Sequence, residues 1–111
     1  MALIEQVKFD ERSRQIRGTG RLNSRVPVAI EWTDAGQTHR AEGHTKDISA
    51  KGCMAIVPQG LAVGQRLRLI NSVNQNSTQA VLIWRGHQGP AGWELGLELQ
   101  EPPIDFWGLD F

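Results

Sequence analysis

Cysteine is scarce in this sequence, because Cys53 is the only one among 111 residues. A single cysteine cannot build a disulfide framework within the chain, which argues against the disulfide-rich secreted domains and agrees with a reducing compartment. The cytoplasm is therefore the expected location. The three histidines, His39, His44 and His87, are scattered and show no metal-ligand spacing with this cysteine. We expect no metal and no cofactor, and we interpret Cys53 as a buried, inert thiol.

Long apolar runs are also missing. No stretch approaches the ~20 residues that span a bilayer. The first residues, MALIEQVKFDERSR, lack the charged start and apolar block of a secretory signal. We therefore expect no membrane insertion. A chain of 111 residues suits one domain around a single core.

The chain has no excess of charge of either sign, since its formal net charge is zero. The distribution is uneven: residues 1–25 hold six basic and three acidic groups, and the remainder holds six basic and nine acidic ones. A mildly acidic body argues against a broad nucleic-acid surface. The run QRLRLIN has basic residues without the interleaved aromatic rings that a single-strand binder needs. A basic arm that holds a small anion is compatible with this pattern.

The sequence after residue 25 is organised in short runs of period two, separated by glycine, proline, asparagine and aspartate. Helical periodicity is not apparent there. Loops are predicted at the Asp34–Gly36 turn, at GLAVG and between Gly86 and Gly92. Six short strands with turns between them predict an all-β, antiparallel barrel or sandwich, and a barrel is favoured because closure removes exposed edges. The predicted strands are residues 26–32, 38–49, 53–57, 65–71, 77–84 and 92–99.

The two ends of the chain are expected to differ from the barrel. Residues 1–20 are predicted to form a flexible, basic N-terminal arm, whose first sixteen residues fit an extra strand, a helical turn or a loose segment. The barrel domain then covers residues 21–111. In the short aromatic tail EPPIDFWGLDF, two prolines block strand continuation. We expect its rings to cap an open end of the barrel: Phe106, Trp107 and Phe111.

Two short motifs carry the chemistry. In RLNSR, Arg21 and Arg25 are four residues apart, and on a loop their guanidinium groups can converge on one phosphate or address a guanine edge. In DISAKG, Asp47 and Ser49 share one face of a strand, and an ionised aspartate accepts the hydrogen bonds that guanine N1–H and N2–H₂ donate. Gly52 lets the backbone approach a flat ligand closely.

The motifs RxxxR and DxSxxG, in this order and about twenty residues apart, resemble those of the PilZ domain family. The Val-Pro-Val step after Arg25 and the pair AVLIW and GWELGLEL add to the likeness, which covers roughly residues 17–107. The resemblance implies a six-stranded β-barrel that acts as a non-enzymatic receptor for the bacterial second messenger cyclic di-GMP. It also implies that Arg21 and Arg25 hold the ligand, that binding orders the arginine loop as the signal, and that a downstream protein receives it.

The same resemblance assigns the other ligand-binding residues. Asp47, Ser49 and Gly52 form the floor of the site, and Trp84 stands where some members place an aromatic ring beside the nucleotide. Two departures are visible: Leu22 replaces a second arginine that many members have, and the chain after Phe106 is too short for the long helix of many members.

Each of these assignments has an alternative. Asp47 and Ser49 can cap a turn, and the arginines can form a solvated arm. The glycine is required for the turn in either case. Trp84 can belong to the core, where we also place Trp32 and Trp93. The alternative function is a PilZ-like protein–protein adaptor without nucleotide binding, marked by an exposed apolar patch around Phe106, Trp107 and Phe111.

Overall fold

The alternating runs of the sequence fold as β-strands. The structure, a computed structural model of the 111-residue chain, describes residues 21–108. The predictions for the N-terminal arm (residues 1–20) and for Phe111 lie outside the described residues. The residues that are described contain no helix able to cross a membrane. They form seven strands: β1 (Leu22–Asn23), β2 (Pro27–Asp34), β3 (Gln37–Ser49), β4 (Gly52–Val57), β5 (Arg66–Asn71), β6 (Ser77–Gly89) and β7 (Gly92–Gln100).

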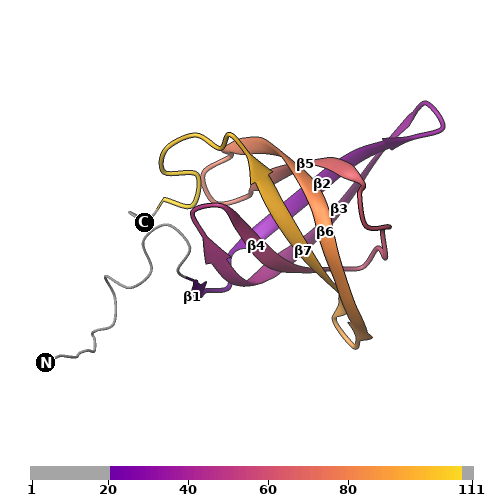
Figure 1. Ribbon diagram of the computed structural model, residues 1–111, viewed down its shortest axis with the longest axis horizontal. Helices are drawn as coiled ribbons and strands as arrows, with labels where there is room; N and C mark the ends of the chain where they lie inside the picture. The colour runs from indigo at the N-terminus through magenta and orange to yellow at the C-terminus, as the bar shows by residue number, and fades with distance from the viewer. Residues whose placement is uncertain (1–20, 109–111) are drawn as a thin grey trace, which may run out of the picture.

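Six of these strands close into an antiparallel barrel, as predicted (Figure 1). The order around the ring is β3-β2-β5-β6-β7-β4, and a pairing between β4 and β3 closes it. β1 lies outside the ring and pairs with β3 alone, with Leu22 opposite Ile48 and Asn23 opposite Asp47. Closure leaves the long strands without an unpaired edge over most of their length.

Alternation decides which side chains fill the barrel. In β5, Leu67 and Leu69 are buried and Arg66 and Arg68 are exposed. The same period places Leu95, Leu97 and Leu99 of β7 in the core. Trp32 is buried as expected. Trp93 is only half-buried: it packs against the core, and the Arg85 guanidinium lies over its ring at 5.1 Å.

The hairpin between β2 and β3 turns where the sequence predicts it. Ala35 and Gly36 have φ angles of 51° and 79°, the pair of positive values that a type I′ turn requires. This turn matches the twist of the flanking strands. The hairpin projects beyond the barrel as a two-stranded extension (Figure 1).

The loop predicted between Gly86 and Gly92 is wrong for most of its length. β6 continues to Gly89, and only Pro90 and Ala91 connect it to β7. The pairing with β7 shifts register between Leu82 and Trp84 and again between Arg85 and Gln88. These bulges absorb extra residues into the strand, so glycine at position 86 does not end it.

The aromatic tail packs as predicted for the two rings that are described. Phe106 and Trp107 are 3% and 7% exposed and belong to the hydrophobic core. Their rings meet edge to face with centroids 4.8 Å apart. We call residues 101–108 the closing segment, because they curl over one end of the barrel (Figure 1). The patch expected of an adaptor is absent at these two residues.

Candidate functional site

A groove of about 380 Å³ lies on the outer wall of the barrel, where β4, β7 and β6 run side by side. Four of the six predicted site residues line it, although they come from three distant parts of the sequence: Arg21, Ser49, Gly52 and Trp84. The other lining residues are Lys51, Cys53, Met54, Ile83, Gly96, Leu97 and Glu98. The volume is within the range of small-molecule sites.

The DISAKG motif forms the end of β3, a turn, and the start of β4. A bulge at Lys46 shifts the pairing between β3 and β4 just before Asp47. The Ser49 hydroxyl accepts a hydrogen bond from the Lys51 N–H at 3.3 Å and donates to the Gly52 carbonyl at 3.4 Å. Ser49 therefore caps the turn and lines the groove at the same time, so the two interpretations of this residue do not exclude each other.

Gly52 is needed for a reason other than turn conformation. Its φ is not in the left-handed region, and the residue is buried. A Cβ at this position would stand 2.3 Å from the Leu97 carbonyl oxygen of β7. The interpretation that the turn requires this glycine is therefore wrong, because close approach of β4 to β7 is what excludes a side chain.

The RLNSR motif is held against the barrel. Leu22 pairs opposite Ile48 and packs on the core. The Thr45 hydroxyl donates to the Ser24 carbonyl and accepts from the Val26 N–H at 2.8 Å. Among the residues described, the motif is therefore not an open loop. It forms the short strand β1, and the Thr45 side chain of β3 then holds the chain by two hydrogen bonds.

The two arginines of this motif point to different places. Arg21 Nη1 lies 2.6 Å from Asp47 Oδ1, and the two side chains are 60% and 21% exposed. Arg21 lines the groove and Asp47 does not, so this ion pair links Asp47 to a groove residue. Arg25 is exposed and does not line the groove. Its charge acts instead on His44, where burial and, secondly, Arg25 lower the imidazole pKa.

Trp84 lies outside the core, with 46% of its surface exposed. Strand parity would place it inward with Leu82. The bulge at Ile83 reverses that parity, and Trp84 pairs instead with the outward-facing Gly96. Two glycines make room for its ring: a Cβ at Gly86 would stand 2.4 Å from Trp84 Cη2, and one at Gly96 would stand 3.2 Å from Trp84 Cβ. The indole is thus an exposed ring on the groove wall.

Cys53 lies beneath the groove and is 4% exposed. Burial, reinforced by the negative charge of Asp47, raises the pKa of its thiol to about 12. A thiol with this pKa is protonated at neutral pH and is a poor nucleophile. The predicted inert role agrees with this environment. Among residues 21–108, no cluster of three or more metal-ligating side chains occurs.

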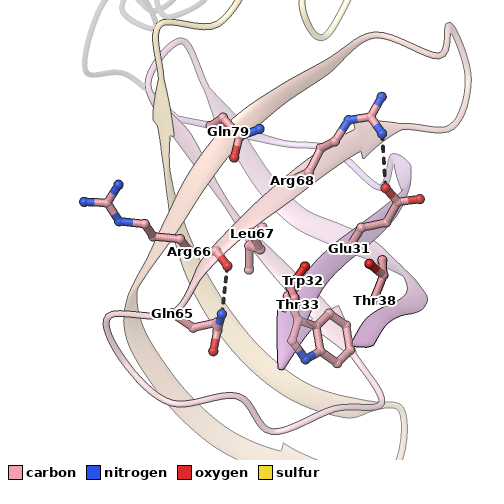
Figure 2. A pocket seen from close by; sticks show the side chains of 9 residues that line it. All are labelled: Glu31, Trp32, Thr33, Thr38, Gln65, Arg66, Leu67, Arg68 and Gln79. Atoms are coloured by element: carbon pink, nitrogen blue, oxygen red, sulfur yellow. Dashed lines mark hydrogen bonds and ion pairs between the residues drawn. The ribbon is translucent and has the colours of Figure 1, made fainter. Parts of the chain in front are cut away.

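A second groove of about 400 Å³ lies between β2 and β5, and none of the predicted site residues lines it (Figure 2). Its floor contains Trp32 and Leu67. Arg68 is engaged by Glu31 at 3.1 Å and by Ser77 at 3.1 Å. The Arg66 guanidinium extends away from the groove (Figure 2). This groove offers no converging cations, and we place the candidate site at β4, β7 and β6.

The sequence matches the PilZ domain family over residues 12–106. Since this match covers most of the chain, the protein belongs to the PilZ domain family. Members are non-enzymatic binding domains that generally bind cyclic di-GMP and act through protein partners. A search of curated proteins gives no significant match.

Several groove residues were missed by sequence reasoning. Lys51 lies inside the DISAKG motif, and Met54 and Glu98 follow from the outward parity of β4 and β7. Lys51 could therefore have been predicted from the motif, and Met54 and Glu98 from the alternation of inward and outward side chains. Ile83 is outward by the same alternation, and the bulge in β6 is what places Trp84 beside it.

Proposed function

We propose that this PilZ domain is a receptor for cyclic di-GMP and that the groove at β4, β7 and β6 is its site. One observation carries the proposal: Arg21, Ser49, Gly52 and Trp84 meet around a single groove. The resemblance assigns the same four residues to the ligand. We further propose that the receptor uses no cofactor and passes its signal to a protein partner.

The groove offers matched chemistry for a guanine dinucleotide. The exposed Trp84 ring is a flat surface for stacking a purine, and Gly86 and Gly96 leave room for that ring on the wall. Arg21 and Lys51 are the cations of the groove for phosphate. Asp47, held beside the groove by Arg21, is an acceptor for the N–H groups of guanine.

The ion pair between Arg21 and Asp47 implies an exchange of partners on binding. A phosphate would replace the carboxylate on Arg21, while guanine donors would replace the guanidinium on Asp47. An exposed ion pair contributes about 0–1 kcal/mol, whereas hydrogen bonds to charged groups contribute about 1.5–3 kcal/mol each. The existing ion pair is therefore only a small obstacle to this exchange. We propose that the signal is this change of partner at Arg21. The strand β1 does not need to become ordered, because it already pairs with β3.

Leu22 bears on the strength of binding. Position 22 has a leucine in place of the second arginine of many members, so the motif has no third guanidinium. The Leu22 side chain packs on the core instead. We infer that Lys51 partly compensates, since its ammonium lies on the same groove. A lysine contacts phosphate as a point charge and lacks the bidentate geometry of arginine. The affinity should therefore depend strongly on Arg21.

Isothermal titration calorimetry of the wild-type protein with cyclic di-GMP tests the proposal, with GTP as the control for simple anion binding. Arg21→Ala should weaken binding about ten- to hundredfold. Arg40→Ala is the matched control, because Arg40 also forms an exposed ion pair, with Glu31 at 2.7 Å, away from the groove. Equal effects of the two substitutions would contradict the assignment.

Arg25→Ala tests whether the second arginine of the RLNSR motif contacts the ligand. The resemblance gives Arg25 a ligand contact, but its side chain is not part of the groove lining. The measured loss of affinity will show how far the second arginine takes part. Phe106 and Trp107 are buried, so the adaptor alternative is not favoured at these two described residues.

A further inference from the structure

The closing segment reaches the candidate site from one end of the barrel. Trp107 Nε1 donates a hydrogen bond of 2.9 Å to the Ser49 carbonyl, and both residues are buried. Ser49 thus lines the groove and has its carbonyl bonded to the closing segment. No strand pairing is involved in this contact, which joins residues 58 positions apart.

The closing segment is itself fixed at the neighbouring residue. The Phe106 carbonyl accepts hydrogen bonds from Asn71 Nδ2 at 2.9 Å and from Asn74 Nδ2 at 3.3 Å. Asn71 is 1% exposed, and its side-chain oxygen accepts from the Val73 N–H at 2.9 Å. A buried amide with both ends paired fixes its surroundings, because leaving either end unpaired is costly.

Besides its internal hydrogen bonds, three contacts reach the Ser49–Gly52 turn from β7 and the closing segment. The Lys51 carbonyl accepts from the Leu99 N–H at 2.9 Å, and Gly52 lies against the Leu97 carbonyl. Both of these contacts come from β7 and belong to the barrel. The third comes from Trp107 alone. It is therefore the one contact of the three that can change without opening the barrel.

We propose that the closing segment is a latch that positions the Ser49–Gly52 turn for the ligand, with Trp107 as the positioning residue. The inference rests on the proposed function, because its ligand is the cyclic di-GMP of the same groove. Holding the Ser49 carbonyl fixes the peptide plane that follows it, and this restricts where the hydroxyl and the Lys51 side chain stand. A turn held in the binding geometry loses less freedom when the ligand arrives.

The coupling must act in both directions. If the latch raises ligand affinity by some factor, then bound ligand stabilises the latch by the same factor. Ligand binding in the groove therefore stabilises the contacts of the closing segment, although none of the residues of this segment lines the groove. Ile104 of this segment is 91% exposed, so a change in the latch is presented at the surface.

The decisive variant is Trp107→Phe, which keeps an aromatic ring and removes the N–H donor. Its dissociation constant for cyclic di-GMP should rise about three- to tenfold. The control is Ile30→Val, a core substitution away from the site that also lowers stability. It should bind as the wild type does. Asn74→Ala removes one donor from the exposed side of the latch and should weaken binding in the same direction, but less.

Indole N–H signals of the ¹⁵N-labelled protein supply a readout that general destabilisation would not move. The chain has four tryptophans, and the Trp107 signal is the one that Trp107→Phe removes. On titration with cyclic di-GMP, the Trp84 and Trp107 signals should shift while that of Trp32 stays. A shift of Trp84 without Trp107, together with wild-type affinity of Trp107→Phe, would overturn the latch alone. If neither signal moves, the proposed function fails and the latch fails with it.

Discussion

Replacing Gly52 by alanine tests the tightest contact at the candidate site. The substitution adds one methyl group between β4 and β7, two strands that pair along their length. The new Cβ would be 2.3 Å from the Leu97 carbonyl oxygen. Real Cβ atoms essentially never come closer than 3.0 Å to such an atom. The obstacle is backbone in a closed ring, so neither strand can move without disturbing its other partner.

The expected cost follows from the behaviour of overpacked interiors. Inserting a methyl group into a well-packed site costs about 1–3 kcal/mol. We expect the upper half of that range for Gly52→Ala, because backbone must shift. A loss of about 2–3 kcal/mol lowers the melting temperature of a domain this size by about 10–20 °C. This is a large part of the total, since domains are stable by only about 5–15 kcal/mol.

Thermal unfolding without nucleotide, followed by circular dichroism, measures this effect. Gly89→Ala is the matched control: it is the same substitution in a strand, at a position where a Cβ meets nothing within 4 Å and φ is not positive. This variant should melt at or slightly above the wild-type temperature. If Gly52→Ala melts with Gly89→Ala and loses only nucleotide affinity, the packing argument is refuted and Gly52 serves ligand approach.

Three further predictions concern single side chains. Native Cys53 should resist Ellman's reagent at pH 8 and react once the chain is unfolded, because burial raises its pKa to about 12; rapid reaction of the folded protein would contradict its burial. Because burial and Arg25 lower the pKa of His44, the unfolded chain binds the proton more readily, and stability should fall as the pH drops through about 6.5. His44→Gln should flatten that fall in denaturant unfolding, and an unchanged pH profile would count against it. Asp47→Asn should change stability by less than about 1 kcal/mol, as expected for an exposed pair; its affinity for cyclic di-GMP should nevertheless fall about tenfold, because an amide presents donors to the donors of guanine. Calorimetry that finds wild-type affinity would exclude Asp47 from the site.

The strands were predictable because burial follows a period of two. Leu67 and Leu69, or Leu97 and Leu99, alternate with charged residues, and the sequence shows this directly. The turn at Ala35 and Gly36 was predictable for an equally local reason, since glycine tolerates the positive φ that Gly36 adopts.

The site was predictable only in part. The motifs led to Arg21, Ser49 and Gly52, which the fold brings together. The exposure of Trp84 depends on a bulge that one sequence does not reveal, because parity within 77–84 places the residue inward. Local signals also cannot give the bond from Trp107 to Ser49, since the closing segment has no periodic pattern.

Hydrogen–deuterium exchange with and without cyclic di-GMP tests most directly where the ligand binds. We expect protection at the Ser49–Gly52 turn and at residues 83–86 and 96–98, around the groove of β4, β7 and β6. We expect no change at residues 31–33 and 65–68, which line the other groove. Protection at the second set with none at the first would contradict the proposed site.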